Sequence, residues 1–116
     1  MSRAQIRLGA AGEDRAAAWY QARGYRVVVR NWRCAEGELD LICAAGSRLV
    51  VCEVKTRSSL AFGHPAEAVT PAKQRRIRGL ASRWLADGGL GFAPSEIRFD
   101  VAAVVGSSIE VFEAAF

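Results

Sequence analysis

Two acidic residues and a lysine near the middle of the chain have the types and spacing of a hydrolytic site. Asp40 lies in one apolar stretch, residues 37–42, and Glu53 and Lys55 lie in the next, residues 49–57. Carboxylate oxygens are preferred ligands of hard divalent cations. A lysine beside such a cation can bind a phosphate and offset the charge that develops during phosphodiester hydrolysis. The residue types therefore indicate metal-assisted cleavage of a phosphodiester.

Both stretches have the composition of β-strands, and the residues between them suit a tight hairpin turn at 46–47. This turn predicts a register in which Asp40 lies directly opposite Glu53, and Glu38 opposite Lys55. Facing carboxylates on paired strands have Cβ atoms about 4.5–5.5 Å apart and repel each other. A divalent cation between Asp40 and Glu53 would remove that repulsion, which stability alone would not select.

The opposite face of this hairpin is predicted to be apolar, because side chains alternate between the faces of a strand. The cysteines have no C-x-x-C spacing and their number is odd, so we interpret all three, Cys34, Cys43 and Cys52, as small buried hydrophobic residues. The predicted apolar face consists of Leu39, Leu41, Cys43, Val50, Cys52 and Val54.

The rest of the chain alternates between helical and strand patterns. A helix between the third and fourth strands predicts a parallel pairing at that point. We therefore expect one α/β domain over residues 1–116, with element order αβββαββ and a mixed central sheet flanked by helices. The expected elements are a helix over 2–23, strands over 25–33, 37–42 and 49–57, a loop over 58–69, a helix over 70–86, and strands over 96–105 and 108–112.

Local signals support both helices. Gly24 suits the C-terminal end of the first helix, and Gly9 and Gly12 inside it predict a close approach of helix to sheet. Thr70 and Pro71 suit the first positions of the second helix. Its expected buried face consists of Ile77, Leu80, Ala81, Trp84 and Leu85.

Composition limits the function classes. The chain has 116 residues and a net charge of +4, and fourteen of its sixteen basic residues are arginine. Arginine suits phosphate contacts, although a GC-rich genome would give the same bias. The arginines of the second helix, with Lys73, either follow a nucleic-acid backbone or form a solvated face. No stretch is apolar enough to span a membrane and no secretory signal core is evident, so a cytoplasmic location is expected.

The acidic pair with its lysine resembles the D…(D/E)xK signature of restriction-endonuclease-like nucleases, with Leu39 where that superfamily has proline. The longer pattern resembles the bacterial YraN-like family, whose relatives include the archaeal Holliday junction resolvases. The matching stretches are Gly9-Ala10-Ala11-Gly12-Glu13, Gly24-Tyr25 with Asn31-Trp32-Arg33, Gly37-Glu38-Leu39-Asp40-Leu41-Ile42, Val51-Cys52-Glu53-Val54-Lys55-Thr56-Arg57 and Arg98-Phe99-Asp100-Val101.

This resemblance implies a Mg²⁺- or Mn²⁺-dependent nuclease that acts on DNA, including branched or structured DNA. Asp40, Glu53 and the carbonyl of Val54 would bind the metal, and Lys55 would position water or stabilise the phosphate. Glu13, set among small helix residues, would complete the metal shell; the alternative is a solvated glutamate paired with an arginine. One site cuts one strand, so a resolvase-type reaction would need a homodimer.

Three further residues have two readings each. Glu38 either pairs with Lys55 or forms the turn into its strand, and in both cases it would support the site rather than bind metal. Arg57 either contacts a phosphate or is an exposed residue at a strand end. Gln74 either reaches the edge of the site or caps the core.

Two other polar residues are expected to lie outside the chemistry. Asp100 is an acid in an apolar strand, which predicts a structural ion pair or hydrogen bond, with Arg98 as one candidate partner. His64, the single histidine, has no nucleophile arrangement that would make a catalytic triad and is expected in a loop. The alternative to a nuclease is a non-catalytic nucleic-acid-binding module that retains the nuclease fold.

Overall fold

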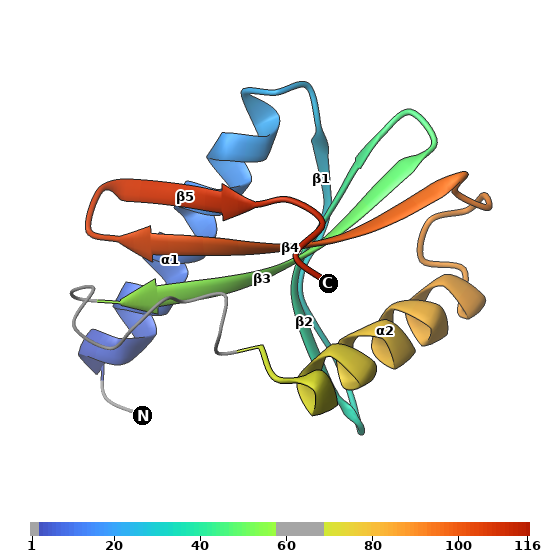
Figure 1. The fold of residues 1–116 in the computed structure, drawn as a ribbon, viewed down its shortest axis with the longest axis horizontal. Coiled ribbons are helices and arrows are strands. Elements are labelled where there is room, and N and C mark those ends of the chain that lie inside the picture. Colours follow the sequence, from blue (N-terminus) through green and yellow to red (C-terminus); the bar gives the residue numbers. More distant parts are fainter. Residues whose placement is uncertain (1–2, 58–68) are drawn as a thin grey trace.

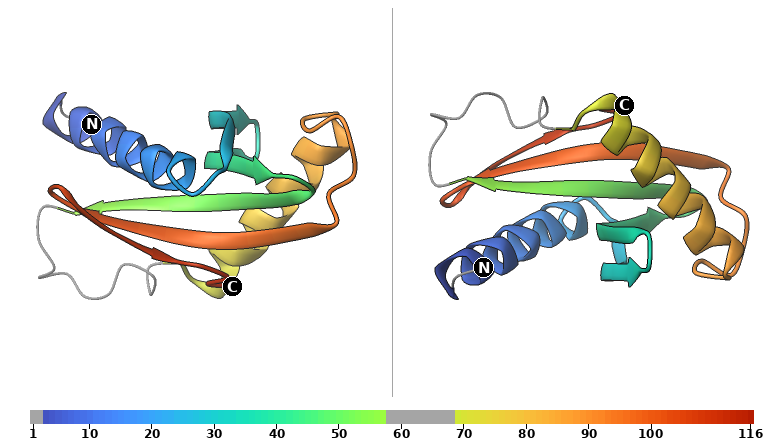
Figure 2. Two further views of the ribbon diagram at one scale, coloured as in Figure 1. Left: turned by 90° about the horizontal axis from the view of Figure 1, so that it is seen from above. Right: turned by 90° about the horizontal axis from the view of Figure 1, so that it is seen from below.

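The computed structural model describes residues 3–57 and 69–116, with side chains from residue 9 onward in the first stretch. Five strands form one sheet between two helices (Figures 1 and 2). Most of the predicted loop over 58–69, including His64, lies outside the described residues. The elements are α1 (Arg3–Gln21), β1 (Arg26–Cys34), β2 (Gly37–Ala45), β3 (Arg48–Arg57), α2 (Pro71–Ala86), β4 (Glu96–Val105) and β5 (Ser108–Phe112).

The strands lie in the order β1-β2-β3-β4-β5, so each strand neighbours the next in the chain. All neighbouring pairs are antiparallel except β3 and β4, which are parallel. The parallel pair requires a long connection, and α2 lies within it. This confirms the predicted element order and the mixed sheet, and the two helices cover opposite faces (Figure 2).

The helix ends follow the predicted signals. Gly24 has φ +86°, and the N–H groups of Gly24 and Tyr25 donate to carbonyls in the last turn of α1, which stops the helix. At the start of α2, the Thr70 hydroxyl accepts the N–H of Lys73, and Pro71 is the first helical residue. Both helices therefore begin or end where local chemistry dictates.

One face of the sheet packs on α1 through small side chains and Tyr20. A Cβ atom added to Gly12 would collide with the Thr56 hydroxyl of β3, so this glycine allows the predicted close approach. Gly9 has nothing within 4 Å of the corresponding position. The prediction that both glycines serve close packing is therefore right for Gly12 and wrong for Gly9. Gly9 lies three residues earlier in α1, where a Cβ atom would meet nothing within 4 Å.

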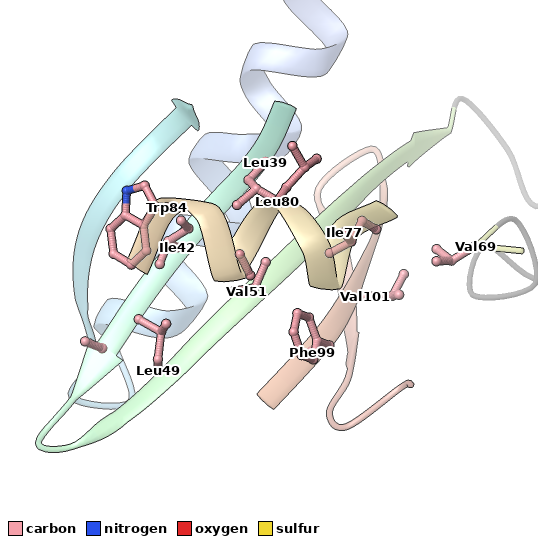
Figure 3. Packing of buried hydrophobic residues seen from close by; sticks show 12 residues of the cluster. Leu39, Ile42, Leu49, Val51, Val69, Ile77, Leu80, Trp84, Phe99 and Val101 are labelled. Carbon is pink, nitrogen blue, oxygen red and sulfur yellow. The ribbon is translucent and has the colours of Figure 1, made fainter. Parts of the chain in front are cut away.

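The opposite face packs on α2, and its buried residues form the larger cluster (Figure 3). Four members of the predicted helix face are fully buried, and Leu85 is partly buried. This cluster consists of Leu39, Ile42, Ala44, Leu49, Val51, Val69, Ile77, Leu80, Ala81, Trp84, Phe99 and Val101.

Leu39 contradicts the prediction of one continuous apolar face. It lies in the cluster under α2 near Leu80 (Figure 3), whereas Leu41 lies in the cluster under α1. Strict alternation requires a regular strand. β2 leaves the β3 ladder beyond Leu41 and continues with β1 alone, through the pairs Trp32↔Leu39 and Cys34↔Gly37. We call residues 30–40 the hairpin arm.

Asp100 is fully buried and has several partners. Arg98 donates two hydrogen bonds to its carboxylate, at 2.9 and 3.0 Å, and the Tyr20 hydroxyl donates a third at 2.6 Å. The backbone N–H of Ala114 donates a fourth. The predicted ion pair with Arg98 is confirmed, and the network ties α1, β4 and the segment after β5 together.

The cysteines are all unpaired thiols. Cys43 and Cys52 are buried as predicted, and burial raises the pKa of both thiols, that of Cys43 to about 12. Cys34 is only half-buried and its thiol donates to Glu36, so the prediction of burial is wrong there. No helix among the described residues is long and apolar enough to cross a membrane.

The two glycines of α1 give a matched test of this packing. Gly12→Ala should lower the free energy of unfolding by about 1–3 kcal/mol, because the added methyl group overpacks against Thr56. Gly9→Ala should raise it by up to about 1 kcal/mol through helix propensity alone. Urea unfolding measures both. Adding Thr56→Ala to Gly12→Ala should restore most of the loss, and equal effects at both glycines would refute the close approach.

Candidate active site

The β2–β3 ladder ends beside the predicted acidic pair. Pairing follows the predicted register and stops at Leu41 and Cys52. One step further, where Asp40 would pair with Glu53, the two strands separate. The carboxylate of Asp40 accepts the backbone N–H of Val54 at 2.9 Å and so replaces the missing ladder bond. We call this opening between β2 and β3 the fork.

The acidic side chains meet at the fork. The carboxyl groups of Asp40 and Glu53 lie close enough for each to change the pKa of the other. Burial, and after it the charge of Asp40, raises the pKa of Glu53 from 4.5 to about 7. Burial also raises the pKa of Asp40, against the opposing effects of the Val54 N–H and Lys55. These two carboxyl groups therefore resist simultaneous ionisation.

Lys55 lies on the same side of β3 as Glu53. Its Nζ atom is 3.6 Å from the Glu53 carboxylate, and only 14 % of its side chain is exposed. Glu38 does not pair with Lys55, as one reading had proposed. It forms an ion pair with Arg33 at 2.6 Å, because β2 follows β1 rather than β3 in the hairpin arm. The ion-pair partner of Lys55 is therefore Glu53, within the site.

Glu13 approaches the fork from α1. The side-chain amide of Asn31 donates to its carboxylate at 3.1 Å. Burial raises the pKa of Glu13, the Asn31 hydrogen bond opposes this, and the negative charge of Asp40 adds to the increase. Asp40 is therefore close enough for its charge to act on Glu13.

Asn31 is the site residue to which the sequence assigned no role. It occupies the β1 position between the partners of Leu41 and Leu39, alongside Asp40. Its φ of +53° is a left-handed conformation that asparagine tolerates better than most residues. An asparagine within a β-branched strand was the available signal.

Two other predicted residues contact the backbone. Arg57 is half-buried and donates to the carbonyl of Thr56 at 3.1 Å. Gln74 donates its amide N–H to the carbonyl of Val69 at 3.0 Å. Because Val69 is a buried member of the cluster under α2, this contact agrees with the reading of Gln74 as a cap on the core.

A cleft of about 310 Å³ opens over Glu53 on the α2 side of the sheet. Its walls are the tip of the hairpin arm and the first turns of α2, with apolar side chains between them. The cleft is lined by Gly37, Glu38, Glu53, Lys73, Arg76, Ile77 and Leu80. Glu53 is therefore reachable from outside through a passage with two cations on one wall.

Among the described residues, no group of three or more His, Cys, Asp or Glu side chains is arranged to hold a metal ion. The fork supplies the neighbouring carboxylates of Asp40 and Glu53. The carboxylate of Glu13 is a third, since the charge of Asp40 contributes to its raised pKa. Any further ligands would come from the backbone or from water.

A family model described as "Uncharacterised protein family UPF0102" matches residues 12–104, which include the fork and both helices. The chain belongs to the UPF0102 family. This confirms the resemblance to the YraN-like group of the restriction-endonuclease-like superfamily.

Curated UPF0102 relatives match over most of their length. The UPF0102 protein of Beutenbergia cavernae is 55% identical over 103 residues, which cover 89% of this chain and 86% of the relative. That of Rhodococcus jostii is 54% identical over 100 residues, covering 86% and 83%. That of Frankia alni is 53% identical over 102 residues, covering 88% and 83%. The names of these UPF0102 proteins state no activity.

Substitutions at Asp40 separate its two roles. In metal-free protein, Asp40→Asn should leave the free energy of unfolding unchanged or slightly higher, because the amide oxygen still accepts the Val54 N–H while the carboxylate repulsion is lost. Asp40→Ala should lower it by about 1–3 kcal/mol, because the N–H loses its partner. Urea unfolding with a chelator measures both, and a large loss in Asp40→Asn would contradict the repulsion.

The pKa of Glu53 predicts a pH dependence of metal-free stability. Its folded-state pKa, about 7, exceeds the ordinary value of 4.5, so the folded state binds more protons between these limits. Stability should therefore fall as pH rises from about 4.5 to 7. Glu53→Gln should lack this component, and the wild-type value minus the mutant value should decrease across that window. A difference that is flat or rises with pH would contradict the raised pKa.

Proposed function

We propose that this protein is a divalent-metal-dependent nuclease that hydrolyses phosphodiester bonds of DNA. The observation that carries the proposal is the meeting of two half-buried carboxyl groups at the fork, with the Lys55 ammonium 3.6 Å from one of them. Buried like charges are costly unless a cation or a proton compensates them. Membership of a family in the restriction-endonuclease-like superfamily supports the same reading.

The donor set fits Mg²⁺ or Mn²⁺. Both are hard cations that take carboxylate and carbonyl oxygens and retain several water ligands. Asp40 and Glu53 would supply the carboxylates. The N–H of Val54 points into the fork, and the N–H and carbonyl of one residue project from the same edge of a strand, so the Val54 carbonyl is available there as well. Glu13 would join directly or through a water molecule.

A bound cation would supply Lewis acidity and lower the pKa of a coordinated water. The protein groups would do the rest. Lys55 would donate to a non-bridging phosphate oxygen and offset the charge that develops on it. The Val54 N–H holds the Asp40 carboxylate in one orientation, and Asn31 holds that of Glu13. Such fixed groups need little reorganisation during the reaction.

The proposed substrate is DNA with branched or otherwise unusual structure, as for the resolvase relatives of the superfamily. The described residues include arginines suited to phosphates but no module that reads base edges, so recognition would depend on backbone shape. Cleavage of two strands of a branched substrate would use two copies of the chain.

One observation favours a second candidate, a nucleic-acid-binding module without catalysis. The described residues bring no three acidic, histidine or cysteine side chains together as a metal group. The two candidates differ in their response to Mg²⁺ or Mn²⁺. A nuclease would be stabilised by the cation through Asp40 and would cleave DNA. A binding module would show no such stabilisation and no cleavage.

Lys55→Ala tests the catalytic reading. The rate of cleavage of branched DNA with Mg²⁺ or Mn²⁺ should fall by about 10²–10³, because a group that stabilises developing charge is lost. Single-turnover measurements with excess protein remove effects on affinity, and Arg26→Ala, an exposed cation on β1, serves as control. Equal rates in wild type and Lys55→Ala would remove Lys55 from the mechanism, and no cleavage by wild type of any branched or linear DNA would favour the binding module.

A further inference from the structure

We propose that the cleft between α2 and the hairpin arm is a binding site for the phosphodiester backbone of a DNA strand, held by Lys73 and Arg76. This site lies beside the fork and adds two specific phosphate contacts to the acidic residues. The inference rests on the proposed function in that the strand would lead toward Glu53. It concerns binding, which needs neither metal nor cleavage.

The charges in the cleft are unequally satisfied. Both acidic residues of the cleft already have a cationic partner. Glu38 is paired with Arg33, and Glu53 is paired with Lys55. The side chains of Lys73 and Arg76 have no hydrogen bond or ion pair within the described part of the chain, and both residues are exposed. Among the described residues, the cleft therefore presents two cations that do not neutralise an acidic side chain.

The other basic residues of α2 differ in this respect. Arg83 is paired with Glu36 and lies 3.8 Å from Asp87, and Arg78 stacks over the ring of Phe99. Arg75 is exposed but does not line the cleft. Among the described residues of α2, Lys73 and Arg76 are thus the basic residues that line the cleft and have no partner.

Helix stability does not explain Lys73. It lies in the first turn of α2, which contains no acidic residue. The positive end of the helix dipole disfavours a cation at that place. Lys73 and Arg76 are three residues apart and so lie on one face of adjacent turns. An anion in the cleft could contact both and offset the unfavourable position of Lys73.

The geometry also fits a strand rather than a small molecule. The cleft is open to the outside, one wall is cationic, and its floor contains the apolar side chains of Ile77 and Leu80. A phosphodiester chain can run along the exposed side chains of Lys73 and Arg76. One end of this path reaches Glu53, where the proposed chemistry occurs.

The test compares two double variants of equal charge. Lys73→Gln/Arg76→Gln removes the cleft cations, and Arg26→Gln/Arg75→Gln removes two exposed cations outside the cleft. Fluorescence anisotropy with a labelled single-stranded DNA, in a chelator and over a range of NaCl, gives the Kd and its salt dependence. Thermal unfolding checks that all three proteins are folded.

The cleft variant should bind at least tenfold more weakly at 0.1 M NaCl. Its slope of log affinity against log salt should be smaller by about 1.4, from about 0.7 for each lost phosphate contact on a single strand. The control variant should change the Kd less than twofold. Equal losses in both variants would mean general charge attraction, and an unchanged cleft variant or a wild type that does not bind would equally overturn the proposal. DNA binding through the cleft without any cleavage would refute the nuclease and leave this inference standing.

Discussion

The hydrogen bond from the Val54 N–H to the Asp40 carboxylate determines how the middle of the sheet is built. A half-buried N–H in a sheet needs an acceptor, and a neighbouring strand normally supplies it. Here a side chain takes that place at 2.9 Å, so the strands can separate without leaving the donor unsatisfied. The fork, the hairpin arm and the cleft against α2 all follow from this substitution of a carboxylate for a backbone carbonyl.

The same bond fixes a charged group where the surroundings disfavour charge. Asp40 and Glu53 are mostly removed from water, and each makes ionisation of the other harder. Two apolar clusters, one on each face of the sheet, stabilise the fold and offset this unfavourable electrostatic free energy. Repulsion between these carboxylates lowers the stability of the folded state, so the rest of the fold must compensate for it. A cation bound between them would remove the repulsion.

Much of the fold was predictable because its signals are local. The turn at Gly46 fixes the hairpin register, Gly24 and Thr70 fix helix ends, and the spacing from Ile77 to Trp84 fixes the buried side of α2. Asp40, Glu53 and Lys55 were accessible for a related reason, since the hairpin register places Asp40 and Glu53 one step beyond the last pair, Leu41↔Cys52. The separation of the strands at that step was not predicted.

Non-local contacts were not predictable from the sequence. The face of Leu39 and the partner of Glu38 depend on where β2 leaves β3, and strand alternation contains no information about that point. The role of Asn31 depends on a left-handed backbone angle and on the approach of Glu13 from another element. The half-exposed thiol of Cys34 lies at the tip of the hairpin arm, where burial is set by α2 and not by residue type.

The parallel pairing of β3 and β4 has a consequence for how the chain folds. The β2–β3 hairpin closes through a turn at 46–47, whereas residues 58–95 must be traversed before β4 can lie beside β3. Closing a long loop costs entropy that is recovered only once the contacts form, and chains with such non-local pairings fold slowly. We therefore expect the acidic hairpin to form in the early, local part of folding, before α2 and β4 enclose it. Until they do, Asp40 and Glu53 remain solvated and their mutual repulsion is weak, so the electrostatic strain of the site arises only at the last stage of assembly.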